Sequence, residues 1–321
     1  MSLNAAAHGI AEQLVARAAA LGVDVLDTAG VRVVDCGVQA RGGLDAGILV
    51  ARAALAGLGD VAVLPAEGGG AWNDWWPDCP WPVVEEHSTA PVAACLAAQC
   101  AGWQVKTPGF FAMASGPVRA AIGREAIYDT IGMRERPPVA VGVLESARLP
   151  PADACLQLAA DAGVRPEALT LLVARTASPA GTVQVSARAL ETALHKLVDL
   201  RFDVSRVRAG WGRAPLPPVP ETDLAAIGRT NDAVLYGSHV VLDVDGPEAD
   251  LAALGPRAVS LASPAHGDPF LTIFERAGRD FYGVDPALFA PARLDLVSVE
   301  TGRRLSFGRL DAQLIARSFS A

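Results

Sequence analysis

An arginine and a glutamate three residues apart are the first candidates for chemistry in this sequence. Apolar periodicity predicts a helix over residues 182–200, on which the side chains of Arg188 and Glu191 lie side by side. In a partly dehydrated pocket a carboxylate stabilises a bound cation, and a guanidinium holds that carboxylate in place and ionised. By spacing alone, a solvated ion pair on an amphipathic helix is the commoner interpretation. His195, one turn after Glu191, can tune the pair, although a surface or packing role is the simpler interpretation.

Hydroxyl groups and a glycine lie where helices are expected to begin. Backbone amides at a helix start can bind an anion, and capping of the helix is the alternative role for such residues. One group precedes or opens the helix of Arg188 and consists of Thr176, Ser178 and Ser186. The other consists of Ser115 and Gly116, followed by Arg119, which can either support a bound anion or lie on the surface.

Two further polar groups are candidate ligand contacts. Asp35 ends a buried-looking strand, where it can contact a ligand or stabilise a turn. A second group precedes an expected strand, and its side chains can bind a ligand or form a turn. This group consists of Arg229, Thr230, Asn231 and Asp232.

The cysteines and the absent motifs restrict the chemistry further. Cys36, Cys79, Cys95, Cys100 and Cys155 form neither a CxxC pair nor a zinc-ligand series, which predicts reduced thiols and no metal site. Cys36 is a candidate nucleophile, but no recognisable motif places a histidine to activate it. The GxGxxG, GxxxxGK[ST], HExxH and GxSxG motifs are absent from the sequence.

Composition and charge indicate a protein that binds a small molecule. The chain has 321 residues, of which 51% are hydrophobic and 19% charged, enough for a sizeable core. A formal net charge of −8 without a Lys/Arg cluster argues against nucleic acid and against anionic membrane surfaces. No apolar stretch approaches 18 residues and no secretory leader pattern opens the sequence, so we expect a cytoplasmic protein.

Strand and helix patterns alternate along the chain, which predicts a layered α/β or α+β fold. Prolines in residues 134–138 predict a linker between two domains, residues 1–136 and 137–321, although the C-terminal segment can return to the first domain. The expected strands are residues 23–26, 31–38, 61–64, 139–144, 169–174 and 234–244. The expected helices are residues 44–55, about 88–103, 152–162 and 182–200.

Twelve short sequence blocks are spread over almost the whole chain. Each block alone is a weak signal, but all twelve in this order form a highly specific pattern. They are residues 33–38 (VVDCGV), 42–47 (GGLDAG), 57–59 (GLG), 101–105 (AGWQV), 111–117 (FAMASGP), 176–178 (TAS), 183–188 (VQVSAR), 191–192 (ET), 228–232 (GRTND), 235–237 (LYG), 280–282 (DFY) and 289–293 (FAPAR). In these blocks the sequence resembles the methenyltetrahydromethanopterin cyclohydrolases of methanogenic archaea and methylotrophic bacteria. Ala114 stands where the family pattern has glycine. Residues 72–82, with Trp72, Trp75, Trp76 and Trp81, depart from the pattern, and these rings can stack on a ligand or partner subunit or pack within their loop.

The resemblance implies an enzyme of one-carbon metabolism, in formaldehyde oxidation or methanogenesis. Its reaction hydrolyses the methenyl bridge of 5,10-methenyltetrahydromethanopterin to the 5-formyl compound. The family's catalytic residues fall on Arg188 and Glu191, with Glu191 as the base that activates water and Arg188 assisting. No metal or cofactor is expected, because the amidinium carbon is already electrophilic. The tetrahydromethanopterin derivative is the substrate.

The resemblance also implies a homotrimer whose substrate pocket lies between the two domains. The hydroxyl, glycine, arginine, asparagine and aspartate candidates named above are then expected to contact the pterin or the phosphorylated tail. One alternative is a non-catalytic pterin carrier or scaffold on the same fold, which would not need Arg188 and Glu191 together. Another is a different amidohydrolase that uses Cys36 or a metal.

Overall fold

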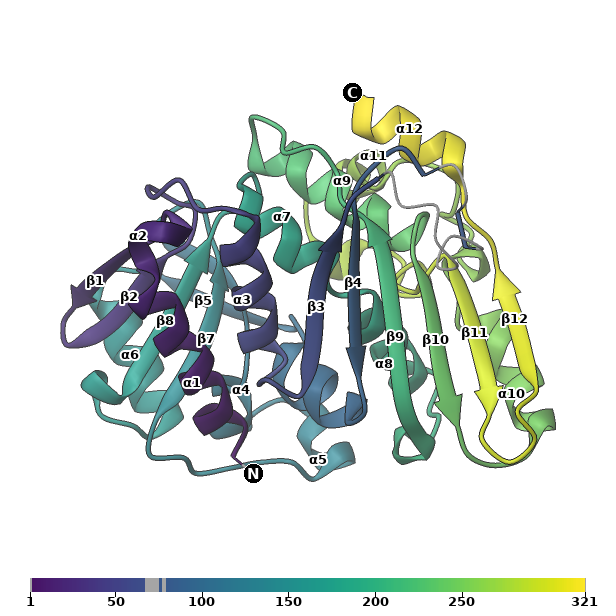
Figure 1. Cartoon of the computed structure of the whole chain (residues 1–321), viewed down its shortest axis with the longest axis horizontal. Coiled ribbons are helices and arrows are strands. Elements are labelled where there is room, and N and C mark those ends of the chain that lie inside the picture. Colours follow the sequence, from purple (N-terminus) through teal and green to yellow (C-terminus); the bar gives the residue numbers. More distant parts are fainter. Residues whose placement is uncertain (1, 67–74, 77–78, 321) are drawn as a thin grey trace. The chain divides into compact units, whose positions relative to one another are not determined.

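The computed structural model describes residues 2–66, 75–76 and 79–320. The chain divides into two compact units, Met1–Asp60 with Val92–Gln184 and Val61–Pro91 with Val185–Ala321. Each unit contains one six-stranded sheet with both parallel and antiparallel pairs, and helices pack on it (Figure 1). The predicted mixed α/β fold is therefore confirmed. None of the helices in the described part of the chain is long and apolar enough to cross a membrane.

The division of the chain differs from the predicted boundary after residue 136. The proline-containing segment 134–138 lies inside the first unit, where Glu135 is fixed at both its backbone and its side chain. The Glu135 carboxylate accepts hydrogen bonds from the backbone amides of Leu3 (3.1 Å) and Asn4 (2.9 Å), and its own amide donates to the Ala120 carbonyl. The prolines thus lie in the connection between α5 and β7, inside one unit and not between two.

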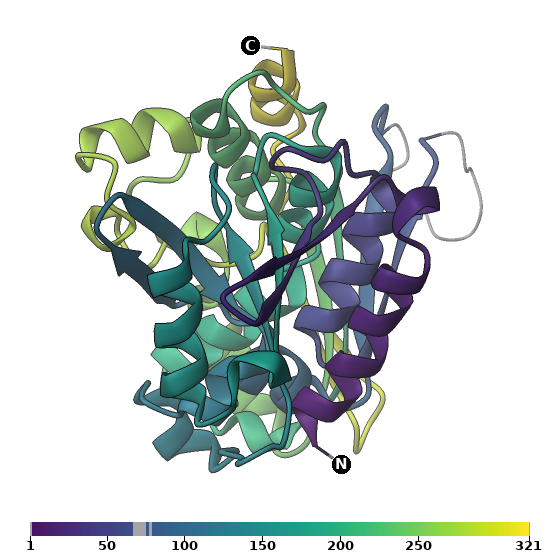
Figure 2. The same cartoon turned by 90° about the vertical axis from the view of Figure 1, so that its left-hand side faces the viewer.

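The first unit is a three-layer arrangement of helices, sheet and helices. Alternate residues of its central strands face opposite sides, so that Val141 and Val143 pack with helices α1 and α3 while Ala140 and Leu144 pack with α4 and α6. Figure 2 shows α1 and α3 side by side on one face of this sheet. The strand order is β1-β2-β8-β7-β6-β5. The elements are α1 (Leu3–Ala16), α2 (Ala18–Leu21), β1 (Asp24–Thr28), β2 (Val31–Asp35), α3 (Leu44–Ala54), the π-helix η1 (Val92–Gln99), β5 (Trp103–Thr107), β6 (Phe110–Ser115), α4 (Val118–Ile122), α5 (Ile127–Ile131), β7 (Ala140–Glu145), α6 (Ala152–Ala162), η2 (Pro166–Ala168), β8 (Leu169–Ala174) and α7 (Pro179–Ser186).

The second unit has a sheet with one fully buried face. On its strand β10, Val240, Leu242 and Val244 are fully buried, whereas Val241 and Asp243 between them are half-buried. The strand order is β12-β11-β10-β9-β4-β3. The elements are β3 (Gly59–Leu64), β4 (Val83–Ser88), α8 (Ala189–Asp199), η3 (Val204–Arg206), β9 (Val207–Pro215), α9 (Asp223–Leu235), β10 (His239–Val244), α10 (Glu248–Leu254), η4 (Gly255–Arg257), η5 (Ser260–Ala262), α11 (Phe270–Arg276), η6 (Phe281–Gly283), β11 (Arg293–Ser298), β12 (Arg304–Gly308) and α12 (Ala312–Ser320).

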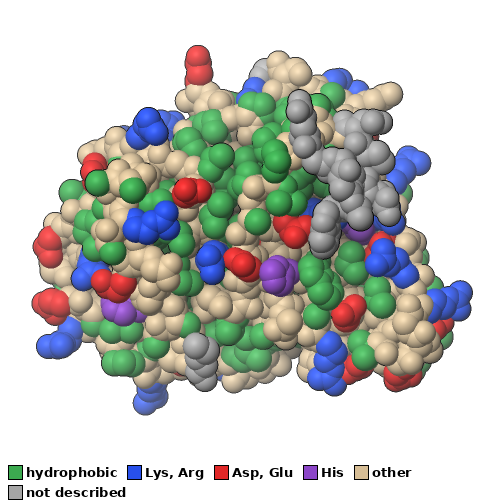
Figure 3. All heavy atoms as spheres, in the orientation of Figure 1, with side chains coloured by type: hydrophobic (Ala, Val, Ile, Leu, Met, Phe, Trp, Pro, Cys, Tyr) green, Lys and Arg blue, Asp and Glu red, His purple; other side chains and the backbone are tan. Residues whose placement is uncertain are grey.

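Helix α8 packs on the strands β9, β10 and β4 of the second sheet. Its apolar stripe, Leu190, Ala193, Leu194 and Leu197, is buried. The opposite face of this sheet is more polar, and Figure 3 shows charged side chains of both signs and histidine over its strands. There His239 Nε2 lies 3.0 Å from a carboxylate oxygen of the fully buried Asp295. Burial alone would raise the pKa of Asp295, but the hydrogen bonds from His239 and Ser306 and the positive charges of His239 and Arg293 lower it to about 2.

Most predicted elements are present with shifted ends, and three are wrong. The helix expected from Ser88 to Trp103 is instead the end of β4, the π-helix η1 and the start of β5. The strand expected over residues 234–244 begins only at His239, because Val234 and Leu235 belong to α9. The helix expected over residues 182–200 is interrupted between Ser186 and Ala189.

Candidate active site

The interruption of the predicted helix lies at Arg188. This residue is the N-cap of α8, with φ −130° and ψ 10°, and its own side chain makes no capping hydrogen bond. In a continuous helix the Leu190 amide would donate to the Ser186 carbonyl. It donates instead to Oε1 of Glu86 on β4, at 2.7 Å. Arg188 and Glu191 therefore lie on either side of the start of a new helix. A single continuous helix was predicted to carry both residues.

Arg188 and Glu191 are both buried, with 7% and 8% of their surfaces exposed. Nη1 of Arg188 lies 3.9 Å from Oε2 of Glu191, too far for a direct hydrogen bond but within reach of a bridging water. The solvated surface pair suggested by spacing alone is wrong. His195, in contrast, has a side chain that is 43% exposed and lies 3.8 Å from Asp199, as its predicted surface role requires.

Ser186 adds a buried hydroxyl two residues before Arg188. Its side chain is 1% exposed, and within the described chain its Oγ has no hydrogen-bond partner. Because buried hydroxyls nearly always have a partner, an unsatisfied one beside two buried charged residues indicates a group that meets a ligand. Ser186 is the predicted substrate contact for which the local structure gives the most direct support.

Asp35 is one of the predicted substrate contacts in the first unit, and it organises the loop that follows β2. Both carboxylate oxygens of this buried residue accept backbone hydrogen bonds, from Gly37 (2.9 Å) and Val38 (2.6 Å) on one oxygen and from the next two residues on the other. A side chain at Gly37 would lie 2.5 Å from the hydroxyl of Ser178, so the loop after β2 packs directly on that serine. The Asp35 carboxylate is thus occupied by its own loop.

Thr176 and Ser178 are also buried and bonded. The Thr176 hydroxyl donates to the Glu145 carboxylate at the end of β7. The Ser178 hydroxyl donates to the Arg175 carbonyl at 2.8 Å and accepts from the Gly181 amide at 3.0 Å, which is the capping role weighed as the alternative. A hydroxyl can accept a second hydrogen bond, so a substrate contact of either residue stays a prediction.

Arg119 is a buried structural residue, and it does not lie on the surface. Its Nε and Nη2 atoms bond both oxygens of Glu125, at 2.9 and 2.7 Å, and Nη1 donates to the carbonyls of Leu96 and Ala98 in η1. The guanidinium also lies 5.6 Å from the centre of the Tyr128 ring. These contacts account for its buried charge without a ligand.

Ser115 and Gly116 are buried between β6 and α4. Gly116 has φ +88°, and a side chain there would lie 3.2 Å from the Val143 amide, so a left-handed turn close to β7 requires glycine. The helix start expected here is present as α4, with Pro117 at its N-cap. A substrate contact of Ser115 and Gly116 stays a prediction.

The polar group at residues 229–232 lies inside helix α9 and is not a turn before a strand. Thr230 and Asn231 donate to carbonyls of the preceding helical turn, at 2.8 and 2.9 Å, and Arg229 donates to the Pro218 carbonyl. Asp232 accepts from the Phe270 amide (2.7 Å) and the Ser318 hydroxyl (2.6 Å), which joins α9 to α11 and α12. Burial raises the pKa of Asp232 to about 7, although both hydrogen bonds oppose the shift.

The structure disfavours Cys36 as a nucleophile. The side chain is fully buried, and its burial, together with the negative charge of Asp35, raises the pKa of the thiol, so the reactive thiolate is suppressed. All five cysteines are free, as predicted. Within residues 2–66, 75–76 and 79–320, no group of three or more His, Cys, Asp or Glu side chains is arranged to hold a metal ion.

Three of the four tryptophans of residues 72–82 pack within the protein. Trp75 and Trp76 have their ring centres 6.0 Å apart, and Trp81 lies between Trp76 (5.9 Å) and Phe319 (5.0 Å). Trp72 lies outside the described residues. These ring contacts favour the loop-packing interpretation for the three described rings.

Sequence reasoning missed Glu86, which is buried against the helix of Glu191, and Lys196, which is a buried residue of that helix. The Lys196 ammonium donates to the Pro286 carbonyl, and burial lowers its pKa while the nearby Asp199 opposes that shift. No sequence signal marks Glu86, because its contact with Leu190 depends on the pairing of strands distant in sequence.

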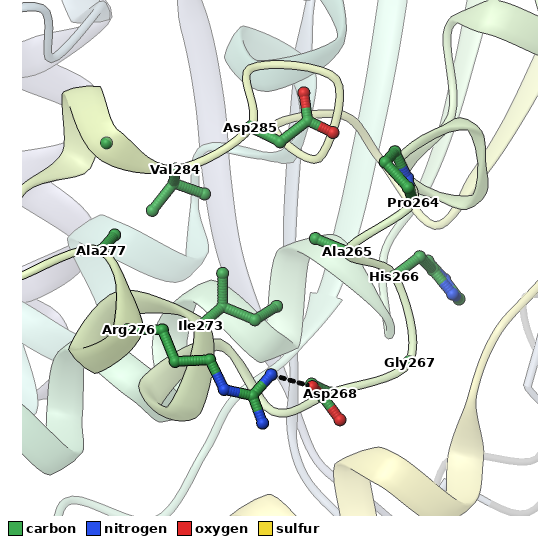
Figure 4. A pocket seen from close by; sticks show the side chains of 11 residues that line it. Pro264, Ala265, His266, Gly267, Asp268, Ile273, Arg276, Ala277, Val284 and Asp285 are labelled. Atoms are coloured by element: carbon green, nitrogen blue, oxygen red, sulfur yellow. Dashed lines mark hydrogen bonds and ion pairs between the residues drawn. The ribbon is translucent and has the colours of Figure 1, made fainter.

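A pocket of about 440 Å³ lies beside α11 in the second unit. Figure 4 shows Arg276 paired with Asp268 on one side, with Asp285 on another side and Ile273 and Val284 between. The predicted site residues are not among the residues that line it. The pocket therefore adds a feature that the sequence did not predict.

Comparison with known proteins identifies the family. A family model described as Cyclohydrolase (MCH) matches residues 2–319. Relatives named methenyltetrahydromethanopterin cyclohydrolase include those of Methylobacillus flagellatus, 40% identical over 320 residues (99% of this chain and 95% of the relative), and Methylobacterium sp. strain 4-46, 42% identical over 325 residues (99% and 98%). The relative from Methanosarcina barkeri is 35% identical over 323 residues, 99% of this chain and 98% of its own. The chain thus belongs to the methenyltetrahydromethanopterin cyclohydrolase family.

Proposed function

We propose that this protein hydrolyses the methenyl bridge of 5,10-methenyltetrahydromethanopterin to the 5-formyl compound. The main support is that the chain matches relatives with this activity in their name over 99% of its length. The burial of Arg188 and Glu191 together at the start of α8 adds independent physical support. Two charged side chains without a function would be costly to bury in that position.

In the proposed reaction Glu191 acts as the base. Its carboxylate takes a proton from water while the water oxygen bonds to the methenyl carbon, which neutralises the amidinium cation. The bond from that carbon to one of its two nitrogens then breaks, and this nitrogen takes up a proton. The new hydroxyl loses its proton and becomes the formyl oxygen. Water is consumed and one proton is released.

Arg188 has two tasks in this mechanism. Its positive charge attracts and orients the Glu191 carboxylate, and its N–H groups can donate to the attacking water or to the hydroxyl of the tetrahedral intermediate. The separation of 3.9 Å between Nη1 and Oε2 leaves room for one water held by both side chains. We assign the buried Ser186 hydroxyl, which has no hydrogen-bond partner within the described residues, to substrate binding.

The remaining parts of the proposal rest on the family resemblance. We infer a cytoplasmic homotrimer that binds a pterin substrate and uses no metal or cofactor. The reaction lies in one-carbon metabolism. A turnover assay that compares methenyltetrahydromethanopterin with methenyltetrahydrofolate tests the substrate class, and equal rates with both would contradict a methanopterin-specific site.

Replacement of Glu191 by glutamine tests the mechanism. We expect turnover, followed as the loss of methenyl absorbance, to fall by about 100-fold or more, because glutamine cannot accept the proton. Asp199→Asn, which removes a half-exposed carboxylate from the same helix, serves as control and is expected to stay near the wild-type rate.

Near-normal turnover of Glu191→Gln would refute the assignment of the base. If the wild-type protein bound the substrate without any loss of methenyl absorbance, the carrier alternative would replace the enzyme. Sensitivity of the wild-type rate to thiol reagents or chelators would instead support the Cys36 or metal alternative.

A further inference from the structure

Glu86 is a buried carboxyl group directly beneath the first turn of α8. Only 1% of its surface is exposed, and its Oε1 accepts the hydrogen bond of the Leu190 amide at 2.7 Å. The first amides of a helix have no partner within the helix and require one from elsewhere. Because the Arg188 side chain makes no capping hydrogen bond, Glu86 supplies an acceptor that the local sequence does not.

The sheet is built to admit this carboxyl group. Glu86 pairs with Gly212 across β4 and β9. A side chain at Gly212 would lie 2.8 Å from the Leu190 backbone nitrogen and 2.9 Å from Oε1 of Glu86. Glycine at this position therefore lets the carboxyl group and the first turn of α8 lie directly on the backbone of β9.

The amide that Glu86 binds belongs to the peptide between Ala189 and Leu190. This peptide lies between Arg188 and Glu191, the two proposed catalytic residues. Its hydrogen bond fixes the point at which the chain leaves α7 and starts α8, and hence the directions in which both side chains leave the backbone. A carboxyl group near a helix N-terminus is also favoured by the helix dipole.

We propose that Glu86 is a positioning residue, which acts through the Leu190 amide to hold Arg188 and Glu191 in their catalytic arrangement. The inference rests on the proposed function. Glu86 touches no reacting atom in this account. Its loss should therefore misplace the base and the guanidinium, and impair the chemical step more than substrate binding.

Two substitutions of Glu86 separate the hydrogen bond from the rest of the side chain. Glu86→Met keeps the length of the side chain but removes the acceptor, and we expect kcat to fall about 10- to 100-fold while KM changes less than about threefold. Glu86→Gln retains an oxygen acceptor of the same shape, and we expect it to keep most of the wild-type kcat. Amide hydrogen exchange in residues 187–192 should be faster in Glu86→Met and near the wild-type rate in Glu86→Gln.

The chain offers two matched controls. Glu85→Met changes the neighbouring residue of β4, whose carboxylate bonds Arg213 at 2.8 Å on the other face of the sheet. Tyr236→Phe removes a buried hydrogen bond, of 2.6 Å to the Asp268 carbonyl, elsewhere in the second unit. Both variants should keep the wild-type kcat even where their thermal midpoints fall as far as that of Glu86→Met.

The outcomes are distinguishable. No turnover by the wild-type protein would overturn the proposed function and this inference with it. With an active wild-type protein, unchanged kcat in Glu86→Met, or an equal loss in Glu86→Met and Tyr236→Phe, would overturn the inference alone. If Glu86→Met does not fold, Glu86→Asp withdraws the carboxyl group by one methylene and is expected to lower kcat in the same way, so that an unchanged kcat in that variant would also refute the inference.

Discussion

At the scale of single residues, burial distinguishes the Arg188–Glu191 pair from a solvated surface pair. Arg188 and Glu191 have the spacing of many solvated helix pairs, and the sequence pattern cannot separate the two cases. The structure separates them, because both side chains are almost fully buried while their atoms remain 3.9 Å apart. The sequence-based expectation of a solvated pair therefore does not hold for these two residues.

Substitution of Arg188 by alanine tests its proposed part in the reaction. We expect kcat to fall by about 100-fold, because the carboxylate loses the neighbouring charge that orients it and the intermediate loses a donor. Steady-state kinetics should show a much smaller change in KM. Arg188→Lys retains the positive charge without the planar guanidinium group. Its kcat should therefore lie between those of the wild type and of Arg188→Ala. A rise in KM with unchanged kcat would make Arg188 a binding contact only.

At the scale of elements, close helix packing depends on a small number of glycines. Gly47 on α3 faces Ala180 and Val183 of α7, and a side chain at Gly47 would lie 2.7 Å from Cβ of Val183 and 2.9 Å from the Ala180 backbone. Gly9 on α1 is a matched contrast, since no atom lies within 4 Å of the position of its side chain. The two helices thus tolerate the same substitution very differently.

Gly47→Ala should lower the free energy of unfolding by about 1–3 kcal/mol, because the added methyl group meets backbone atoms that cannot move aside freely. Gly9→Ala should raise the free energy of unfolding by about 0.5–1 kcal/mol, since alanine favours the helix and fills open space. Urea denaturation of both variants measures these two changes in the free energy of unfolding. A Gly47→Ala protein as stable as the wild type would show that α3 and α7 are not packed as described.

The residue pattern of each strand or helix explains whether that element could be predicted from the sequence. Strands β2, β7 and β8 are runs of buried apolar residues, and their patterns identify them directly. Strand β9 was missed because Gly210 and Gly212, flanked by Arg208 and Arg213, disguise a strand that packs on Leu190 of α8. The residues 229–232 suggested a turn, yet they lie in α9, where Thr230 and Asn231 bond carbonyls one turn back and Asp232 bonds partners on other helices.

At the scale of the whole molecule, the family could be predicted from sequence and the Arg188–Glu191 pair could be proposed from it, while the contacts that support this pair could not. The blocks that identify the family are local in sequence, and so is the spacing of Arg188 and Glu191. Glu86 is about a hundred residues away and reaches Leu190 only through the pairing of β4 with β9. The break between α7 and α8 depends on that contact, so local periodicity predicted a continuous helix.

The stability of the whole molecule should depend on the protonation of Asp232. Its pKa of about 7 in the folded protein lies above the usual value near 3.8, so the folded state holds the proton more tightly than the unfolded state. This stabilisation is complete below about pH 4, is lost as the pH rises towards 7, and amounts to roughly 4 kcal/mol. Asp232→Asn should remove it, so the thermal midpoint of the wild type should fall relative to this variant between pH 5 and pH 8. Parallel midpoints over that range would show that Asp232 is ionised throughout.

The contact between Gly212 and the first turn of α8 has a consequence for engineering. Because this end of the helix lies against both the Gly212 backbone and the Glu86 carboxyl group, the alignment of Arg188 and Glu191 depends on the backbone trace of β9 as well as on Glu86. Apolar side chains elsewhere in the core could be replaced by other apolar side chains in a combinatorial library, and we expect many such variants to retain turnover. A side chain at position 212, in contrast, would displace the Leu190 backbone or the Glu86 carboxyl group, and with them the start of α8.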